Sequence, residues 1–298
     1  MRWSALRNDG SLRTSEGESR VAGQGLVDFH VHIGRMFREE HPARAPLTAQ
    51  QLVDRMNREG IEIAVLLALE SPEGLWGYSL TEEVLAARDM YPERLIAFCA
   101  VDPRYPMVGE FIDHAVHNHG CQGFGEHVCG LRIDDELCHI VYQKCDELGL
   151  PLVIEIAGDL CYDEPGLPGL ECCLRQYPNI RWVGHGPGFW SAISADDPRA
   201  GYPSGPIAPG GALERLLESY PNLYADISAG SGYNALTRDP DFTVGFVERH
   251  WRRMLFGTDY LSPGDELPIL KWLQELDMPA RVRRAIGGDN ARELLGMG

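Results

Sequence analysis

The stretch Leu-Val-Asp-Phe-His-Val-His-Ile-Gly, residues 26–34, sets the pattern for the whole chain. Apolar residues alternate in it with Asp28, His30 and His32, so a strand of period two places these three side chains on one face. Two imidazoles at the end of a buried strand are costly to desolvate, and a transition metal is the usual partner. The alternative is that one of the histidines is a hydrogen-bonded core residue, because so short a motif also arises by chance.

Length and charge narrow the class of protein. The chain has 298 residues, which suits a single α/β barrel domain, and a formal net charge of −17. So negative a chain repels the phosphates of nucleic acids and anionic membrane surfaces, so we expect neither as a partner. We expect a small-molecule substrate, and a homodimer is left open.

The cysteines and the apolar runs of the sequence indicate the cellular compartment. Eight cysteines without a Cys-x-x-Cys pair predict reduced, mostly buried thiols. No apolar run reaches the roughly 18 residues of a membrane span, and the N-terminus lacks the apolar run of a signal peptide. We therefore expect a cytoplasmic protein. Residues 1–25 are expected to form a polar N-terminal extension before one domain over residues 26–298.

Apolar runs alternate with amphipathic helical patterns from residue 26 onward, which predicts eight strands and eight helices. A closed (β/α)8 barrel, the TIM barrel, is the natural architecture, because a doubly wound sheet needs fewer strands and usually a Gly-rich nucleotide turn. The expected strands are residues 26–34, 61–68, 95–101, 122–126, 152–156, 180–184, 223–227 and 254–257. The expected helices are residues 48–60, 80–90, 107–117, 136–148, 169–176, 212–220, 242–251 and 266–276. Residues 186–197 and 228–234 are expected to be loops over the rim.

Polar residues that end the strands are the candidate functional residues, because the active site of such a barrel lies at the carboxyl ends of its strands. They are His30, His32, Glu126, Glu155, His185, Asp226 and Asp259. Imidazole and carboxylate are ligands that Zn²⁺, Mn²⁺ and Fe²⁺ prefer. His127 follows Glu126 and points to the opposite face, so we expect it to pack or to support a ligand.

A metal at this rim would lower the pKa of its bound water and polarise a substrate carbonyl. We expect the following ligands: His30, His32, Glu126, Glu155, His185 and Asp259. Of these, Asp259 is the expected catalytic base and His185 the second catalytic residue. A structural role, such as a buried ion pair with an arginine, stays open for Glu126 and Glu155.

Two further residues are candidates for substrate binding. The guanidinium fork of Arg132 suits a substrate carboxylate, although an ion pair with Asp134 or Asp135 explains this arginine equally well. Trp190 lies beside Phe189 in an expected loop over the rim, where an aromatic wall suits a small organic substrate.

Four ordered motifs resemble the amidohydrolase superfamily. They are Val-Asp-Phe-His-Val-His at 27–32, Trp-Val-Gly-His-Gly-Pro-Gly at 182–188, Leu-Phe-Gly-Thr-Asp-Tyr at 255–260 and Gly-Asp-Asn-Ala-Arg-Glu-Leu-Leu at 288–295. The chain is most similar to the amidohydrolase-related branch, which includes aminocarboxymuconate-semialdehyde decarboxylase and pyrone-dicarboxylate lactonase. The resemblance implies that His30, His32, His185 and Asp259 occupy the ligand positions of that family.

One position departs from the family pattern. Family members usually have a histidine at the end of the fifth strand, where this chain has Glu155. A carboxylate still binds a divalent cation, but it shifts the preference somewhat from Zn²⁺ towards Mn²⁺ or Fe²⁺. Glu126 matches a position at which related barrels bridge two metals. We nevertheless favour one ion over two, and zinc over manganese or iron.

Three functions follow as hypotheses. The first is a metal-dependent hydrolase in which metal-activated water attacks the carbonyl of an ester, lactone or amide. The second is a metal-dependent non-oxidative decarboxylase, with a protonated His185 or Asp259 donating to carbon. The third is a non-catalytic relative that binds a metal or ligand. Because His30 stands where the resorcylate-type decarboxylases have glutamate, the resemblance leans away from that type, and a decarboxylase of the semialdehyde type stays open.

Overall fold

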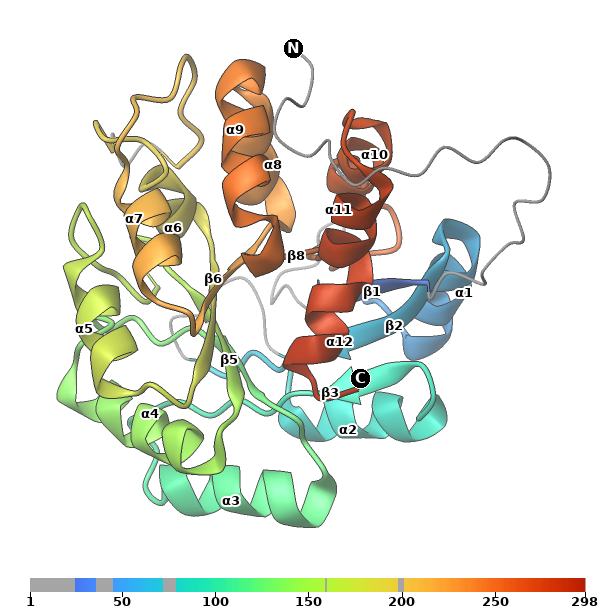
Figure 1. The fold of residues 1–298 in the computed structure, drawn as a ribbon. Helices are drawn as coiled ribbons and strands as arrows, with labels where there is room; N and C mark the ends of the chain where they lie inside the picture. Colours follow the sequence, from blue (N-terminus) through green and yellow to red (C-terminus); the bar gives the residue numbers. More distant parts are fainter. Residues whose placement is uncertain (1–24, 36–44, 72–78, 159, 198–200, 298) are drawn as a thin grey trace.

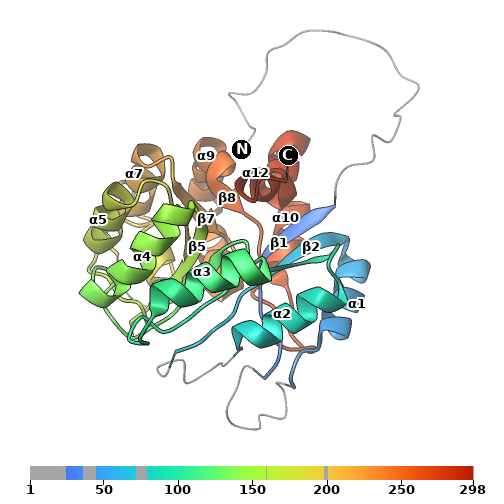
Figure 2. The same cartoon turned by 90° about the horizontal axis from the view of Figure 1, so that it is seen from below.

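Parallel strands form the inner wall of the structure, and the helices surround them (Figures 1 and 2). The structure is a computed structural model that describes residues 25–35, 45–71, 79–158, 160–197 and 201–297. The strands of these residues are β1 Leu26–Val31, β2 Ile61–Leu66, β3 Leu95–Ala97, β4 Phe124–His127, β5 Pro151–Glu155, β6 Arg181–His185, β7 Leu223–Asp226 and β8 Met254–Leu255. The expected extension, residues 1–25, lies outside the described residues except for its last one.

The strands follow one another in chain order around a closed barrel. Two parallel sheets, β1-β2-β3 and β4-β5-β6-β7-β8, contain them all. Cys99 joins the sheets on one side, because its N–H donates to Gly123 O (3.0 Å) and its carbonyl accepts from Gly125 N (2.8 Å). On the other side Phe29 N donates to Phe256 O (2.9 Å). The prediction of a single-domain (β/α)8 barrel is confirmed.

Helices cover the outside of the barrel. They are α1 Ala49–Glu59, α2 Thr81–Met90, α3 Val108–His119, α4 Glu136–Leu148, α5 Pro168–Gln176, α6 Pro187–Ser191, α7 Ala212–Ser219, α8 Ala229–Thr237, α9 Pro240–His250, α10 Pro268–Glu275, α11 Ala280–Arg284 and α12 Asn290–Leu294, with a 3-10 turn η1 Trp251–Arg253 and a π-helical turn η2 Ala285–Asp289. Local chemistry sets the ends of α1: Thr48 and Gln51 form a capping box, and Gly60 ends the helix in the left-handed conformation.

Two expected loops are helical, which corrects the sequence prediction. Helix α6 follows β6, and α8 follows β7. Glycines in both segments argue against a helix on propensity alone. Tertiary packing overrides that preference, because a side chain at Gly188 or Gly232 would lie 2.7 Å from Ile156 O or 2.4 Å from Ile227 O. The glycines therefore allow these helices to pack directly on the backbone that follows β5 and β7.

The core has an outer and an inner part. The larger cluster joins the helices to the outside of the strands. A smaller one fills the barrel interior with Val27, Phe29, Val65, Phe98, Val153, Val183 and Leu255, among others. Val31 packs in the outer cluster but Phe29 in the inner one, and the pairing of β1 with β2 shifts register between Asp28 and Val31. Strict alternation along β1 is therefore not kept.

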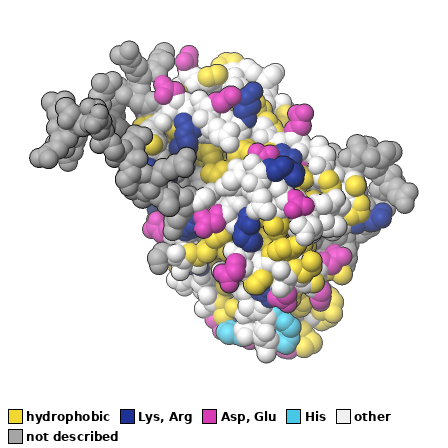
Figure 3. All heavy atoms as spheres, turned by 90° about the vertical axis from the view of Figure 1, so that its right-hand side faces the viewer, with side chains coloured by type: hydrophobic (Ala, Val, Ile, Leu, Met, Phe, Trp, Pro, Cys, Tyr) yellow, Lys and Arg dark blue, Asp and Glu magenta, His cyan; other side chains and the backbone are white. Residues whose placement is uncertain are grey.

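The surface charge and the state of the cysteines were also predicted from the sequence. Acidic and basic side chains are interspersed over the described part of the face in Figure 3, without a continuous basic stripe. None of the described helices is both long and apolar enough to span a membrane. No disulfide joins any of the eight cysteines, and all but Cys172 are buried. The expectation of mostly buried thiols is confirmed.

Candidate metal centre

The two histidines of β1 meet at the carboxyl end of the barrel. His30 Nε2 lies 3.0 Å from His32 Nε2. Glu126 at the end of β4 approaches both, because its Oε2 lies 3.6 Å from His30 Nε2 and 3.3 Å from His32 Nε2. All three side chains are buried, with 4% or less of each residue exposed. Residues that are distant in the sequence thus bring three donor atoms to one point.

His185 and Asp259 complete the arrangement. His185 Nε2, at the end of β6, lies 3.9 Å from Glu126 Oε1. Asp259 Oδ1, which follows β8, lies 3.6 Å from His30 Nε2 and 3.7 Å from His32 Nε2. The donor atoms form two groups, each within 4.8 Å, that share His30: one with Glu126 and His185, the other with His32 and Asp259.

The opposite nitrogens of the three rings are held by acceptors. His30 Nδ1 donates to Asp226 Oδ2 (2.6 Å), and His32 Nδ1 donates to Leu67 O (3.1 Å). His185 Nδ1 donates to Asp226 Oδ2 (3.0 Å), since the Ser228 hydroxyl beside it already donates to the same carboxylate (2.8 Å). In a neutral imidazole this leaves every Nε2 as a lone pair.

This arrangement fits a cation. The Nε2 atoms of His30 and His32 lie 3.0 Å apart with the Glu126 carboxylate beside them, so a positive charge at this point is favoured. Glu126 Oε1 is also buried and has no hydrogen-bond partner within the described residues. Neutral imidazoles with carboxylates are a donor set for Zn²⁺, Mn²⁺ or Fe²⁺, and ligating histidines usually donate their other N–H to an acceptor, as these do.

Packing around strand β8 positions Asp259. Asp28 accepts from Thr258 N (2.9 Å) and from Thr258 Oγ1 (2.7 Å), which fixes the residue before Asp259. Asp259 itself has a φ of 55°, a left-handed conformation that is uncommon for aspartate and recurs at functional sites. A side chain at Gly257 would lie 2.8 Å from Asp226 Oδ1, so only glycine allows this close approach.

Glu155 lies at the same rim but apart from the other donors. It pairs in register with His185 on the neighbouring strand, and its side chain is partly exposed. It belongs to neither group of clustered donor atoms. Burial, together with the charge of Glu126, raises the pKa of Glu155 to about 8. A role of Glu155 as a metal ligand therefore stays a prediction.

Both residues predicted to bind substrate make contacts within this chain. Arg132 Nε binds Asp134 Oδ1 (2.9 Å) and Arg132 Nη1 binds Glu164 Oε1 (3.2 Å), so its fork is already engaged by carboxylates of this chain. Trp190 is 2% exposed, and its indole N–H donates to Asp226 O (2.9 Å). Trp190 is thus a packing residue behind the site, because helix α6 turns it into the core.

The sequence predicted no role for Asp226, Ser228 or Thr258. It identified Asp226 only as the polar residue that ends the seventh strand. Its partners His30 and His185 lie on other strands, and no local sequence pattern predicts contacts between them.

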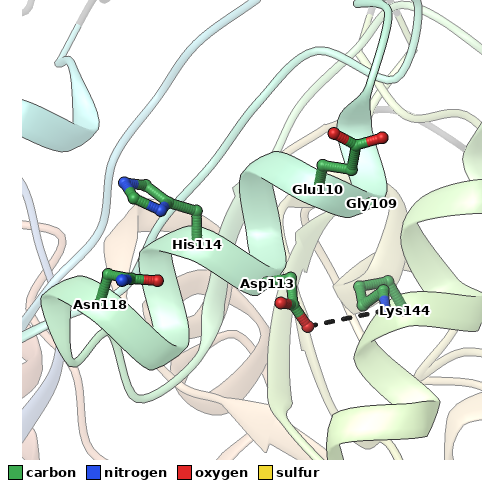
Figure 4. Close-up of a pocket in the computed structure, with 6 residues that line it drawn as sticks. All are labelled: Gly109, Glu110, Asp113, His114, Asn118 and Lys144. Atoms are coloured by element: carbon green, nitrogen blue, oxygen red, sulfur yellow. Dashed lines mark ion pairs between the residues drawn. The ribbon is translucent and has the colours of Figure 1, made fainter.

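A pocket on the outer helices lies away from this centre. It is lined by Gly109, Glu110, Asp113, His114, Asn118 and Lys144, from α3 and α4 (Figure 4). Asp113 Oδ1 and Lys144 Nζ are 3.8 Å apart, whereas His114 and Asn118 point away from that pair. These side chains do not converge on one point, so the pocket offers no comparable chemistry.

Fold and site together define a (β/α)8 barrel with histidine and carboxylate donors gathered at the carboxyl ends of its strands. A family model described as Amidohydrolase matches residues 27–297, and the protein belongs to this amidohydrolase family. The resemblance in the sequence motifs is thereby confirmed. No curated protein matches the sequence.

Solved structures share the fold at low identity. An uncharacterised TIM-barrel protein from Bordetella bronchiseptica is 17% identical, with 91% of this chain and 98% of that chain covered and a TM-score of 0.66. A dihydroxybenzoic acid decarboxylase from Polaromonas sp. JS666, with bound manganese and 2-nitroresorcinol, is 15% identical (92% and 97% covered, TM-score 0.59). A probable 2-pyrone-4,6-dicarboxylic acid hydrolase from Acinetobacter baumannii is 14% identical (91% and 99% covered, TM-score 0.57).

Proposed function

We propose that this protein is a metal-dependent hydrolase of a small substrate that carries an ester, lactone or amide carbonyl. The observation that carries the proposal is the convergence of three histidine Nε2 atoms on the buried Glu126, whose Oε1 has no hydrogen-bond partner within the described residues. His30, His32, His185, Glu126 and Asp259 would hold one divalent ion. That ion, zinc or alternatively manganese, would polarise the substrate carbonyl and activate water.

Asp259 is the proposed base. Its side chain is 22% exposed, against 4% for Glu126, so it is the carboxylate of this group that substrate and water can reach. The hydrogen bonds of Thr258 to Asp28 hold the adjoining backbone in place, which suits a group that must accept a proton at a defined position. His185 is the second proposed catalytic residue, since its ring is oriented by Asp226.

Two residues at the edge of the centre are proposed to face the substrate. Glu155 is partly exposed and stands beside His185, outside the clustered donors. Tyr202 is 60% exposed, and its partial burial, followed by the charges of Asp259 and Glu155, raises its pKa. An acid and a phenol at the mouth suit hydrogen bonds to a polar organic molecule.

The charge of the site favours hydrolysis over decarboxylation. Within the described residues, none of the hydrogen bonds and ion pairs of the five proposed ligands involves a lysine or arginine, and Arg132 is engaged elsewhere. A carboxylated substrate needs a cation to offset its charge, whereas a neutral ester or lactone needs none beyond the metal.

The test compares two panels of substrates. Protein stripped with a chelator is reloaded with Zn²⁺ or Mn²⁺ and assayed for hydrolysis of esters, lactones and amides, and separately for release of CO₂ from aromatic acids. We expect hydrolysis that requires the metal. Asp259→Asn should lower kcat per bound metal by about 10²- to 10⁴-fold. Asp102→Asn is the control, because Asp102 also follows a strand but binds Arg104. CO₂ release without hydrolysis, or no turnover in either panel at full metal loading, would contradict the proposal.

A further inference from the structure

A second group of metal-binding side chains lies outside the rim centre. It consists of His127, Cys129, Cys138 and Cys161, which we call the sulfur cluster. Cys129 Sγ is at its middle, 3.7 Å from His127 Nε2, 3.6 Å from Cys138 Sγ and 3.4 Å from Cys161 Sγ. The donor atoms of His127, Cys129 and Cys138 all lie within 4.8 Å of one another, whereas Cys161 is outside this group and approaches it through Cys129.

The sulfur cluster is buried and joins separate parts of the chain. Each of its four residues is at most 1% exposed. His127 ends β4, Cys129 lies in the loop after it, Cys138 is in the first turn of α4, and Cys161 is in the loop after β5. His127 Nε2 is directed at sulfur, and its ring packs edge to face on Tyr142 (5.6 Å). The mechanism proposed above uses none of these four side chains.

The spacing suits a tetrahedral ion. With Zn–S of about 2.3 Å and Zn–N of about 2.0–2.1 Å, tetrahedral geometry puts two sulfurs about 3.8 Å apart and a sulfur about 3.6 Å from a nitrogen. The three distances from Cys129 differ from these values by a few tenths of an ångström. Three cysteines and one histidine are a common ligand set of structural zinc sites, which are closed to water as this cluster is.

We propose that the sulfur cluster is a structural zinc site. Binding would convert the three thiols to thiolates with release of three protons to solvent, while His127 contributes the lone pair of Nε2, and no oxidation state changes. The ion would tie α4 and the loops after β4 and β5 to the strand end that carries Glu126. The inference is independent of the reaction at the rim.

Cobalt substitution tests the proposal on the full-length protein. Because the cluster is buried, metal enters during folding, so the protein is expressed in medium with Co²⁺ in place of zinc. We expect intense thiolate-to-cobalt charge-transfer bands in the near ultraviolet. The rim centre does not produce them, because its donors are nitrogen and oxygen. Absence of hydrolase activity in a protein that shows these bands would overturn only the proposed function. Hydrolase activity in a protein without these bands would overturn only this inference.

Variants and thiol counts complete the test. Cys138→Ser should abolish the charge-transfer bands or reduce them severalfold. Cys145→Ser, at another buried cysteine of the same helix, should leave them unchanged. If Cys138→Ser does not fold, X-ray absorption of the wild-type zinc protein still decides, because sulfur neighbours at about 2.3 Å are expected. A wild-type cobalt protein without these bands would overturn the proposal. A count of six free thiols in the denatured protein, in place of eight, would also overturn it, because two missing thiols would indicate a disulfide.

Discussion

At the scale of single residues, Asp226 organises the metal centre from behind two of its histidines, because it contacts their Nδ1 atoms and not the Nε2 donors. It is fully buried and accepts from His30, His185 and the Ser228 hydroxyl through Oδ2, and from Ser228 N through Oδ1. These bonds place the protons of both imidazoles on Nδ1, which leaves Nε2 free to bind a metal. One carboxylate thus sets the tautomer of two proposed ligands.

Replacing this carboxylate by an amide should weaken metal binding. In Asp226→Asn, an amide N–H turned towards either ring would favour the tautomer with the proton on Nε2, which cannot bind a metal. We expect metal affinity to fall by about 10- to 100-fold with the fold retained, measured by competition with a chromophoric chelator. Ser228→Ala keeps the carboxylate and should cost less. Wild-type affinity in Asp226→Asn would show that Asp226 does not set the tautomer.

At the scale of elements, helix α6 packs closely against strand β6. Gly184 precedes the ligand His185, and a side chain there would lie 2.1 Å from Phe189 Cε2. Phe189 lies on α6 and is fully buried. The short helix is therefore packed directly on the strand that presents His185, and its position depends on the absence of a Cβ.

A methyl group at this position should be destabilising. We expect Gly184→Ala to lower the free energy of unfolding by about 1–3 kcal/mol through overpacking, measured by urea denaturation. Gly109→Ala in α3 is the matched control, because its nearest neighbour would be Lys144 Cε at an ordinary 3.6 Å. There the change should be neutral or stabilising by about 0.5–1 kcal/mol. Equal effects of the two substitutions would argue against close packing of α6 on β6.

At the scale of the whole molecule, Arg292 connects the end of the chain to its first strands. Its Nη2 donates to Gly25 O (2.8 Å), just before β1, and to Glu62 Oε2 (2.7 Å) on β2. The arginine side chain is 7% exposed. Contacts across more than 200 residues of sequence thus hold α12 against the strands that begin the barrel.

Removing this link should loosen the whole barrel. We expect Arg292→Ala to lower the free energy of unfolding by about 1–3 kcal/mol, because a charged hydrogen bond is lost and Gly25 O loses its partner. Arg284→Ala, at an exposed arginine of α11, should stay within about 0.5 kcal/mol of the wild type. Urea midpoints of the two variants give the comparison. An Arg292 variant as stable as the Arg284 variant would contradict this role.

Much of the fold was predictable because its signals are local. The alternation of apolar runs with amphipathic segments is visible in any window of the chain, and caps such as Thr48 and Gly60 lie beside the helix they delimit. Helices α6 and α8 were missed, because their glycines are unfavourable for a helix until the neighbouring strand is in place. The geometry of parallel strands also predicted that His30, His32, His185 and Asp259 share one rim.

The sequence by itself thus determined the order of the elements and the kinds of donor atom at the strand ends. Only the tertiary structure decided which of them meet: Glu126 lies among the ligands, Glu155 lies beside them, and Arg132 is engaged by its own neighbours. The sulfur cluster, too, appears only when β4, α4 and the loop after β5 are assembled. The physical reason is that hydrogen bonds and metal sites require distances of a few ångströms, and packing alone sets those between residues far apart in the chain.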